Sequence, residues 1–305
     1  LASLEGLEGC CGIKLFAGSS TGNLLVAEED DIDKVFQNAS RVVAVHSEDE
    51  EILRNNKKLI KEGDVHTHPI WRSVECAIAS TRRIVRIAEK YNKKAHILHI
   101  TTKEEIDFLS QHKGNITFEI TPQHLTLYAP DCYEKLGAYA QMNPPLRDKS
   151  HYDRLWYGVR NNLNDTIGSD HAPHLKVNKD KKYPNTPSGM PGVQTLMPVM
   201  LNHINEGKLS LTQLMKFVCE NPVKIFGIKN KGFIKEGYDA DFTIVDMNKI
   251  IEIKNENIES KCKWSPFNGF KFKGAPVFTI VGGVIKMENG KILGDPNGSP
   301  LNFNN

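Results

Sequence analysis

The first 230 residues show two different patterns of apolar and polar positions. Short apolar runs predict five strands, at residues 13–16, 42–45, 96–100, 116–120 and 166–168. The segments between these runs have the 3.6-residue period of amphipathic helices, most clearly over residues 73–91, where several apolar side chains fall near one face. Repeated strand–helix units of this kind indicate a parallel sheet covered by helices.

The number of these units falls short of a closed barrel. An eight-stranded barrel of strand–helix units needs about 250 residues, or roughly 30 per unit. Five units therefore leave about three missing, and the sequence starts at Leu1 without a methionine and reaches strand-like residues almost at once. We expect an α/β fold of the TIM type, (β/α)8, in which this chain supplies about the last five units and the first strands precede Leu1 in a longer polypeptide.

The sequence pattern changes after Lys231. The segments GFIKEGYDADFTIVD and APVFTIVGGVIKMENGKI contain short strand-like runs separated by glycine-rich or Asn-Gly turns. These features predict a small β-sandwich part. We therefore expect a catalytic barrel domain over residues 1–230 and a C-terminal β appendage with its tail over residues 231–305.

Composition narrows the classes of partner. The 305 residues are 39% hydrophobic and 25% charged, which is enough for a large buried core. The formal net charge of +2 gives no field for nucleic acid or an anionic membrane. No apolar stretch approaches the roughly 20 residues that span a bilayer, and the six cysteines show no CxxC pairing. These observations predict a small-molecule partner and a reducing, cytoplasmic compartment.

Residues able to bind metal lie at the ends of the apolar runs. Lys14 lies in GIKLF, His46 ends VVAVH, His99 lies in HILHITT, and Asp170 and His174 lie in TIGSDHAPH. In barrel enzymes of this type the catalytic groups come from the C-terminal ends of the strands, so these side chains are expected to meet at one rim. The pattern predicts a two-metal hydrolase.

Each of these residues also has an ordinary structural interpretation. An isolated lysine is more often exposed, a histidine at a strand end is more often only hydrogen-bonded, and an aspartate before a helix is commonly an N-cap. Lysine is, however, a poor occupant of an apolar strand, and the candidates occur together in chain order, so metal binding is favoured for the set. His96 is three positions from His99, faces the other way and is interpreted as structural.

Seven motifs resemble the amidohydrolase superfamily and, within it, the dihydroorotases. They cover nearly the whole sequence: GIKLF, AVHSED, HILHIT, NPPLR, SDHAPH, GMPGVQ and KGFIKEGYDADFTIVD. The resemblance implies two divalent metal ions, with zinc as the expected element, bound by Lys14, His46, His99 and Asp170. It also implies that Lys14 reacts with carbon dioxide to form a carbamate that bridges the metals, and that Asp170 is the catalytic residue that accepts the proton of the bridging water.

The same resemblance implies a reaction, the reversible hydrolysis of dihydroorotate to N-carbamoyl-aspartate in de novo pyrimidine synthesis. Asn143 of NPPLR would bond the ring amide, His174 would contact the substrate carboxylate, and the backbone of Pro191 and Gly192 would close over the ring. Hydantoinases and dihydropyrimidinases usually carry a serine before PPLR and lack that histidine, so a hydantoinase-type cyclic amidase is the alternative. Taken alone, Asn143 is explained as a pre-proline turn residue and Gly192 as a turn glycine.

One motif of the resembled family is missing from the sequence. Members open their barrel with HxHxR on the first strand, whereas the only HxH here, His66-Thr67-His68, follows His46 in what we expect to be a polar loop. This departure motivates a third alternative, an inactive dihydroorotase-like scaffold subunit, although the intact ligand set argues against it. The resemblance also implies a homo-oligomer, with a transcarbamoylase as a further candidate partner. The GSSTGN segment at 18–23 is interpreted as an ordinary strand–helix connection, with a lid over the substrate as the alternative.

Overall fold

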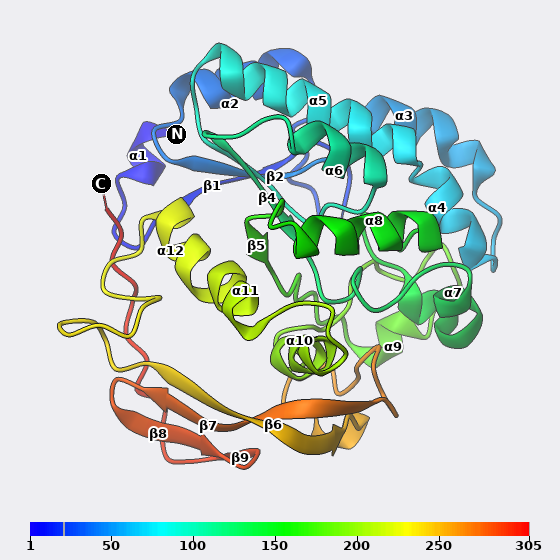
Figure 1. Ribbon diagram of the computed structural model, residues 1–305. Helices are drawn as coiled ribbons and strands as arrows, with labels where there is room; N and C mark the ends of the chain where they lie inside the picture. Colours follow the sequence, from blue (N-terminus) through cyan, green and yellow to red (C-terminus); the bar gives the residue numbers. More distant parts are fainter. Residues whose placement is uncertain (21, 305) are drawn as a thin grey trace.

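The computed structural model describes residues 1–20 and 22–304, and its larger sheet has five parallel strands in chain order (Figure 1). Each strand pairs with the next, and helices cover the outer side. The strands are β1 (Gly12–Phe16), β2 (Val42–His46), β3 (Ala95–Ile97), β4 (Ile116–Ile120) and β5 (Thr166–Ile167). The predicted fold class, strand–helix units of a TIM-type barrel followed by a C-terminal β part, is confirmed.

The helices follow the strands in the order that the sequence pattern predicted. They are α1 (Ala2–Glu5), α2 (Glu29–Asn38), α3 (Glu50–Asn56), α4 (His68–Trp71), α5 (Val74–Lys90), α6 (Lys103–Leu109), α7 (Asp131–Leu136), α8 (Lys149–Arg160), α9 (Lys176–Lys179), α10 (Leu196–Asn205), α11 (Leu211–Met215) and α12 (Asn221–Phe226). Short 3₁₀ segments are η1 (Lys57–Leu59), η2 (Val65–Thr67), η3 (Gly137–Ala140) and η5 (Asn255–Asn257), and η4 (Lys216–Glu220) is a π-helix. None of the helices in the described residues is long and apolar enough to cross a membrane.

Helix α5 shows why the sequence pattern was readable. The side chain of Ser73 accepts a hydrogen bond from the amide of Cys76 and caps the helix where the 73–91 pattern began. The apolar residues of the pattern, including Ala77, Ile84 and Ala88, are fully buried. The helix therefore presents its apolar face to the sheet and its charged face to solvent.

The third strand is shorter than predicted. Strand β3 ends at Ile97, so residues 98–100 of the expected strand lie beyond it. The amide of Leu98 still donates to the carbonyl of Val45 at 3.1 Å. His99 then takes a φ of 40°, in the left-handed region, which ends the extended chain. The strand prediction failed here because the backbone turns at a candidate ligand.

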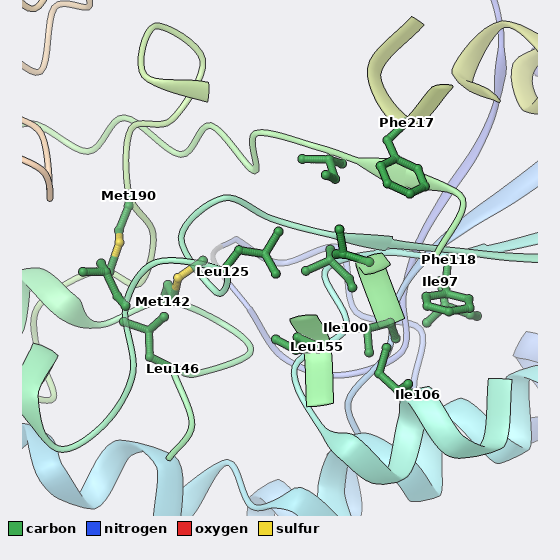
Figure 2. Packing of buried hydrophobic residues seen from close by; sticks show 14 of the residues in the cluster. Ile97, Ile100, Ile106, Phe118, Leu125, Met142, Leu146, Leu155, Met190 and Phe217 are labelled. Carbon is green, nitrogen blue, oxygen red and sulfur yellow. The ribbon is translucent and has the colours of Figure 1, made fainter. Parts of the chain in front are cut away.

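One apolar core holds the strands against the helices. Ile97 and Phe118 are paired in register on β3 and β4, and with Ile106 of α6 they belong to a single buried cluster (Figure 2). The same cluster extends to Met142 and Met190, in the loops beyond the strand ends. Burying each such side chain contributes about 1.5–3 kcal/mol. The rim of the sheet is therefore supported by well-packed loops.

A second sheet of four antiparallel strands follows the barrel units. Its strands are β6 (Phe242–Glu252), β7 (Lys271–Val281), β8 (Val284–Glu288) and β9 (Lys291–Ile292). The Asn-Gly turn predicted from the sequence is confirmed, because Asn289 and Gly290 have φ of 48° and 87° between β8 and β9. Strands β6 and β7 have 11 residues each and are longer than the expected short strands. The division into domains at residues 1–230 and 231–305 remains a proposal.

Helix α10 joins the two sheets. It packs along β7, where the amide group of Asn205 donates to the carbonyls of Met247 and Lys273 at 3.0 and 2.9 Å. Gly274 allows the approach, since a Cβ there would lie 2.6 Å from the Cβ of Leu201. The C-terminal strands thus lie beneath the barrel helices (Figure 1).

Candidate metal centre and substrate pocket

Two predicted ligands, His46 and His99, meet at the rim of the sheet. His46 is the last residue of β2, and His99 lies two residues beyond β3. The Nδ1 atom of His46 lies 3.1 Å from the Nε2 atom of His99, and the rings pack edge to face with centroids 4.9 Å apart. Both side chains are buried. The structure therefore brings these two candidate ligands together.

The spacing and charge of this pair fit a shared metal ion. Two nitrogens that each lie about 2.0–2.1 Å from a tetrahedral zinc are about 3.3 Å apart, close to the observed separation. Burial lowers the pKa of His46 and lowers that of His99 well below its ordinary value. Both imidazoles are therefore neutral at physiological pH, which is the form that binds metal.

A buried ion pair lies behind His46. The Nε2 atom of His46 is 3.0 Å from a carboxylate oxygen of Glu48, and Nε of Arg72 is 3.1 Å from both oxygens of that carboxylate. Burial alone would raise the pKa of Glu48, but Arg72 and His46 hold it well below its usual range. A carboxylate on the outer nitrogen fixes the orientation of a ligating imidazole. Sequence reasoning missed this pair, because the HxE spacing by itself does not reveal the distant arginine.

The other two predicted ligands, Lys14 on β1 and Asp170 just past β5, influence each other electrostatically. The Lys14 side chain is exposed to solvent at its surface. The surrounding protein nevertheless desolvates its amine and lowers the pKa of Lys14 to about 8, although the negative charges of Asp170 and Glu119 act to raise that pKa. Burial raises the pKa of Asp170 to about 6; Glu119 adds to this shift and Lys14 opposes it. Asp170 also has a left-handed backbone, with φ of 41°. Lys14, Glu119 and Asp170 therefore lie close enough for the charge of one to shift the pKa of another.

Glu119 is a further charged residue that the sequence analysis did not select. It lies on β4, opposite Thr166 in register, and its carboxylate occupies the space above Gly168. A Cβ at position 168 would lie 2.1 Å from a Glu119 oxygen. His96 is 4.0 Å from the same carboxylate and bonds the hydroxyls of neighbouring threonines, as a structural residue would. The sequence Phe118-Glu119-Ile120 in β4 could have revealed this residue. Side chains alternate between the two faces of a strand, so Glu119 must face away from the two buried apolar residues beside it.

The predicted ligands thus form two pairs, which we call the histidine pair (His46 and His99) and the lysine–aspartate pair (Lys14 and Asp170). Within residues 1–20 and 22–304, no three His, Cys, Asp or Glu side chains lie together in a metal-binding arrangement. A carbamate on Lys14 would add two oxygens between the pairs, which is the chemistry that the donor set lacks. The two histidines and the aspartate are therefore of types that bind divalent metal ions, and Lys14 would join them only after modification.

The HxH at residues 66–68 is not the polar loop that the sequence suggested. His66 is exposed, but His68 is fully buried at the start of α4. Its Nε2 atom lies 2.9 Å from the carbonyl of Met142 and 3.1 Å from Oδ1 of Asn143. The expectation was wrong because the partners of His68 lie more than 70 residues away in the chain. His68 thus contacts a predicted substrate residue.

The predicted substrate residue His174 lies on a loop tied to the Asn143 segment. Nε2 of His174 donates to the carbonyl of Ser188 at 2.9 Å. Gln141 joins the two segments, because its side-chain amide donates to Ser188 Oγ and its carbonyl accepts from the amide of Gly189, both at 2.9 Å. Hydrogen bonds of Gln141, two residues before Asn143, therefore tie this segment to the loop of His174.

Gly192 packs against the backbone that carries Asp170. Its amide donates to Nδ1 of His171 at 3.1 Å, and a Cβ at this position would lie 2.3 Å from the carbonyl oxygen of Ser169. The sequence left two interpretations of this glycine open, closure of the backbone over a substrate ring and an ordinary turn. The contact that requires it here is with the protein itself, and Pro191 precedes it directly at the same turn.

We expect the substitution Gly192→Ala to push the turn at Ser169 and Asp170 out of position. A displacement of about 1 Å at a catalytic group lowers the rate by a factor on the order of 10². Steady-state kinetics together with circular dichroism would show a loss of kcat/KM with the secondary structure retained. Gly298→Ala is the matched control, because a Cβ there meets no atom within 4 Å. Equal activity of the two variants would contradict the role given to Gly192.

The segment at 18–23 is anchored where it begins, and Thr21 lies outside the described residues. The amide of Ser19 donates to the Glu50 carboxylate at 2.7 Å, and the carbonyl of Ser19 accepts from Arg72. A Cβ on Gly18 would lie 2.4 Å from the carbonyl of Glu48. These contacts favour an ordinary connection, and the alternative role as a lid stays a prediction.

Lys179 is a buried lysine that holds the His174 loop. It is 1% exposed, and its amine donates to the carbonyls of Gln141 and Pro187 at 3.2 and 2.9 Å. The indole of Trp264 lies nearby, with its own N–H donating to the carbonyl of His174 at 2.8 Å. Burial lowers the pKa of Lys179 from its ordinary 10.5 to about 7. The His174 loop is therefore held by a lysine whose neutral form is stabilised by burial.

This lysine predicts a pH dependence of stability. Between pH 7 and 10.5 the unfolded chain binds a proton at Lys179 that the folded chain does not, so the free energy of unfolding rises with pH in this window. Denaturant unfolding at several pH values would show this rise in the wild type and its reduction in Lys179→Met. Lys176→Met, at an exposed position on the same helix, should keep it. Identical pH curves for both variants would refute the assignment.

Comparison with known proteins places this geometry in a family. Residues 26–286 match the model of the Amidohydrolase family. The chain belongs to the amidohydrolase family. Members of this family are metal-dependent, in agreement with the two ligand pairs.

Relatives of this amidohydrolase include proteins named dihydroorotase. It is 34% identical to the dihydroorotase of Methanosphaera stadtmanae, over 85% of this chain and 62% of the relative. It is also 34% identical to that of Pyrococcus furiosus, over 94% of this chain and 64% of the relative. The chain thus spans somewhat less than two thirds of the length of these relatives.

Solved structures with the same fold include two enzymes whose names refer to cyclic amides. The L-hydantoinase (dihydropyrimidinase) of Arthrobacter aurescens superimposes with a TM-score of 0.89 at 29% identity, over 94% of this amidohydrolase and 67% of that chain. The dihydropyrimidinase of Brevibacillus agri gives a TM-score of 0.86 at 25% identity, over 95% and 66% of the two chains. Both agree with the barrel architecture described above.

Proposed function

We propose that this amidohydrolase is a dihydroorotase, which hydrolyses the cyclic amide of dihydroorotate reversibly to N-carbamoyl-aspartate in pyrimidine synthesis. The observation that carries the proposal is the convergence of His46 Nδ1 and His99 Nε2 at the strand ends, beside the lysine–aspartate pair. The dihydroorotases among its relatives support the choice of substrate. The proposed cofactors are two divalent metal ions, zinc being the expected element.

Lys14 is suited to become the carbamate that would bridge these ions. Only a neutral amine adds carbon dioxide, and with a pKa of about 8 roughly a quarter of Lys14 side chains are neutral at pH 7.5. An ordinary lysine would be neutral in only about one chain in a thousand at that pH. When bound, the metal ions supply an activated water and polarise the ring carbonyl.

Asp170 is proposed to move the proton during ring opening. Its pKa of about 6 leaves the carboxylate mostly ionised at neutral pH but able to hold a proton briefly. An oxygen of this carboxylate would take the proton from the attacking water and give it to the ring nitrogen that leaves. The left-handed backbone at Asp170 turns the residue out of the line of β5, at the rim where such a substrate would lie.

His174 can contact a substrate carboxylate only through its second nitrogen. Its Nε2–H is used on the carbonyl of Ser188, so Nδ1 would have to be protonated to donate. Burial lowers the pKa of His174 in this structure, whereas a substrate anion would raise it. We propose that substrate binding is accompanied by protonation of His174.

Two alternatives rest on specific observations. The solved structures named hydantoinase favour a hydantoinase-type cyclic amidase, but Asn143 before PPLR and His174 after DHAP favour dihydroorotate. The absence of HxHxR from the 305 residues motivated an inactive scaffold, against which stand both ligand pairs. We further propose a reducing, cytoplasmic location, supported by six free cysteines, and a homo-oligomer, with a transcarbamoylase as a candidate partner.

The deciding experiment combines metal analysis with assays on four compounds. The purified protein is expected to hold two metal ions and to act on dihydroorotate and carbamoyl aspartate, with kcat/KM at least about 10²-fold above that on hydantoin or dihydrouracil. A preference for hydantoin would replace the proposal with the hydantoinase alternative. Bound metal with no turnover of any substrate would favour the scaffold.

A further inference from the structure

His68 lies beneath Asn143 and is fully buried at the start of α4. Its Nε2 atom is 2.9 Å from the carbonyl oxygen of Met142 and 3.1 Å from Oδ1 of Asn143. The ring is held on its other sides by edge contacts with Trp71 and Tyr183, whose centroids lie 5.8 and 5.7 Å away. The imidazole therefore has a fixed position.

The contact with Met142 determines where the proton of His68 lies. A backbone carbonyl can only accept a hydrogen bond, so Nε2 must carry the hydrogen. Burial and the charge of Arg72 lower the pKa of His68 to about 3, so the ring stays neutral and Nδ1 has no proton. In the described part of the chain, Nδ1 of His68 is buried without a hydrogen-bond partner. One tautomer thus prevails throughout the neutral pH range.

This tautomer dictates the orientation of the Asn143 side chain. The second neighbour of the same N–H must also accept, which places Oδ1 of Asn143 toward His68 and its Nδ2 away from it. Within residues 1–20 and 22–304, no hydrogen bond is made by Nδ2 of Asn143 to another residue. The amide hydrogens of Asn143 are therefore available to a ligand.

We propose that His68 is a positioning residue that makes Asn143 a hydrogen-bond donor to the substrate, so that the pocket selects ligands presenting a carbonyl or carboxylate oxygen at this point. The inference rests on the proposed function, because it assigns Asn143 to the substrate of that reaction. It also gives the HxH segment a role unrelated to metal binding.

The same short segment supports the histidine pair. Four residues after His68, Arg72 ends α4 and holds the Glu48 carboxylate that faces His46. Substrate orientation and metal-ligand orientation are therefore set by neighbouring residues of one element. A variant at position 68 must accordingly be checked for metal content before its kinetics are interpreted.

The test compares two replacements at position 68 in the purified protein. His68→Leu removes the N–H at similar volume, and we expect kcat/KM for dihydroorotate to fall about 10- to 100-fold, mainly through KM, with metal content unchanged. His68→Gln retains an N–H and should recover most of the loss. Asn143→Asp, which keeps an acceptor toward His68 but offers no donor, should lose at least as much as His68→Leu. Wild-type kcat/KM in His68→Leu would overturn the proposal.

A second readout does not depend on the reaction. Nitrogen-15 NMR of labelled histidine should show one ring, absent in His68→Gln, that is protonated at Nε2 and unprotonated at Nδ1 between pH 6 and 8. An Nδ1–H tautomer or an imidazolium at this residue would overturn the inference even if dihydroorotate is turned over. If the wild type does not act on dihydroorotate, the proposed function fails, and the Nε2–H signal still supports the orientation of Asn143.

Discussion

Replacing Lys14 with methionine is expected to remove tight binding of both metal ions and to lower kcat/KM for dihydroorotate by at least about 10³-fold. The histidine pair and the lysine–aspartate pair supply too few ligands for two ions unless Lys14 contributes bridging oxygens. Methionine keeps an unbranched apolar stem close in length to that of lysine, but it has no amine and cannot form a carbamate. Plasma mass spectrometry and steady-state kinetics would measure both effects.

The carbamate itself can be separated from a general loss of structure. Lys179→Met makes the same substitution at a buried lysine outside the ligand pairs, and should retain both metal ions. In Lys14→Ala, added acetate or propionate should restore part of the activity, because a small carboxylate can occupy the space of the carbamate. Two firmly bound metal ions and full activity in Lys14→Met would rule out this role for the residue.

Replacing Arg72 with methionine should lower the free energy of unfolding by about 3–5 kcal/mol, because it leaves the buried carboxylate of Glu48 without its counter-charge. Arg72 also donates to the carbonyl of Ser19, so the loop after β1 should loosen as well. Urea unfolding of the metal-free protein would measure the change. This large effect reflects the cost of an unpaired charge and is not the net contribution of the ion pair.

The controls for this prediction come from the same pair and from the surface. Removing both charges, as in Glu48→Leu with Arg72→Met, should recover much of the lost stability. Arg54→Met, at an exposed arginine with 3.7–3.8 Å contacts to carboxylates, should change it by less than about 1 kcal/mol. Glu48→Gln should also weaken metal binding about 10- to 100-fold, since His46 loses its oriented carboxylate. A small effect of Arg72→Met would contradict the role of Arg72 as the counter-charge of Glu48.

The strands and candidate ligands could be predicted because their signals are local. Each apolar run is bounded by polar residues, and Lys14, His46 and Asp170 lie within three residues of a strand. The parallel register then brings the strand ends to one rim, so chain order alone predicted that the ligands would meet. The end of β3 was predicted wrongly because the apolar run continues to Ile100, so the pattern of hydrophobic residues does not show that the backbone turns at His99.

The supporting residues could not be predicted because their signals are distant. His68 lies between Thr67 and a proline, two positions after an exposed histidine, and only its partner 75 positions later shows that it is buried. Arg72 and Glu48 are 24 positions apart, and both would ordinarily be placed on a helix surface. Burial of a polar side chain depends on a partner from another element, and a single sequence does not reveal such partners.

The backbone at two of the ligands limits what can replace them. His99 and Asp170 have φ of 40° and 41°, whereas Lys14 and His46 lie in regular strands. The left-handed region accepts glycine, asparagine, aspartate and histidine but disfavours β-branched and bulky residues. A combinatorial library aimed at a different metal or a new substrate can therefore be fully randomised at positions 14 and 46. At positions 99 and 170 it should be limited to the few amino acids that adopt a left-handed backbone.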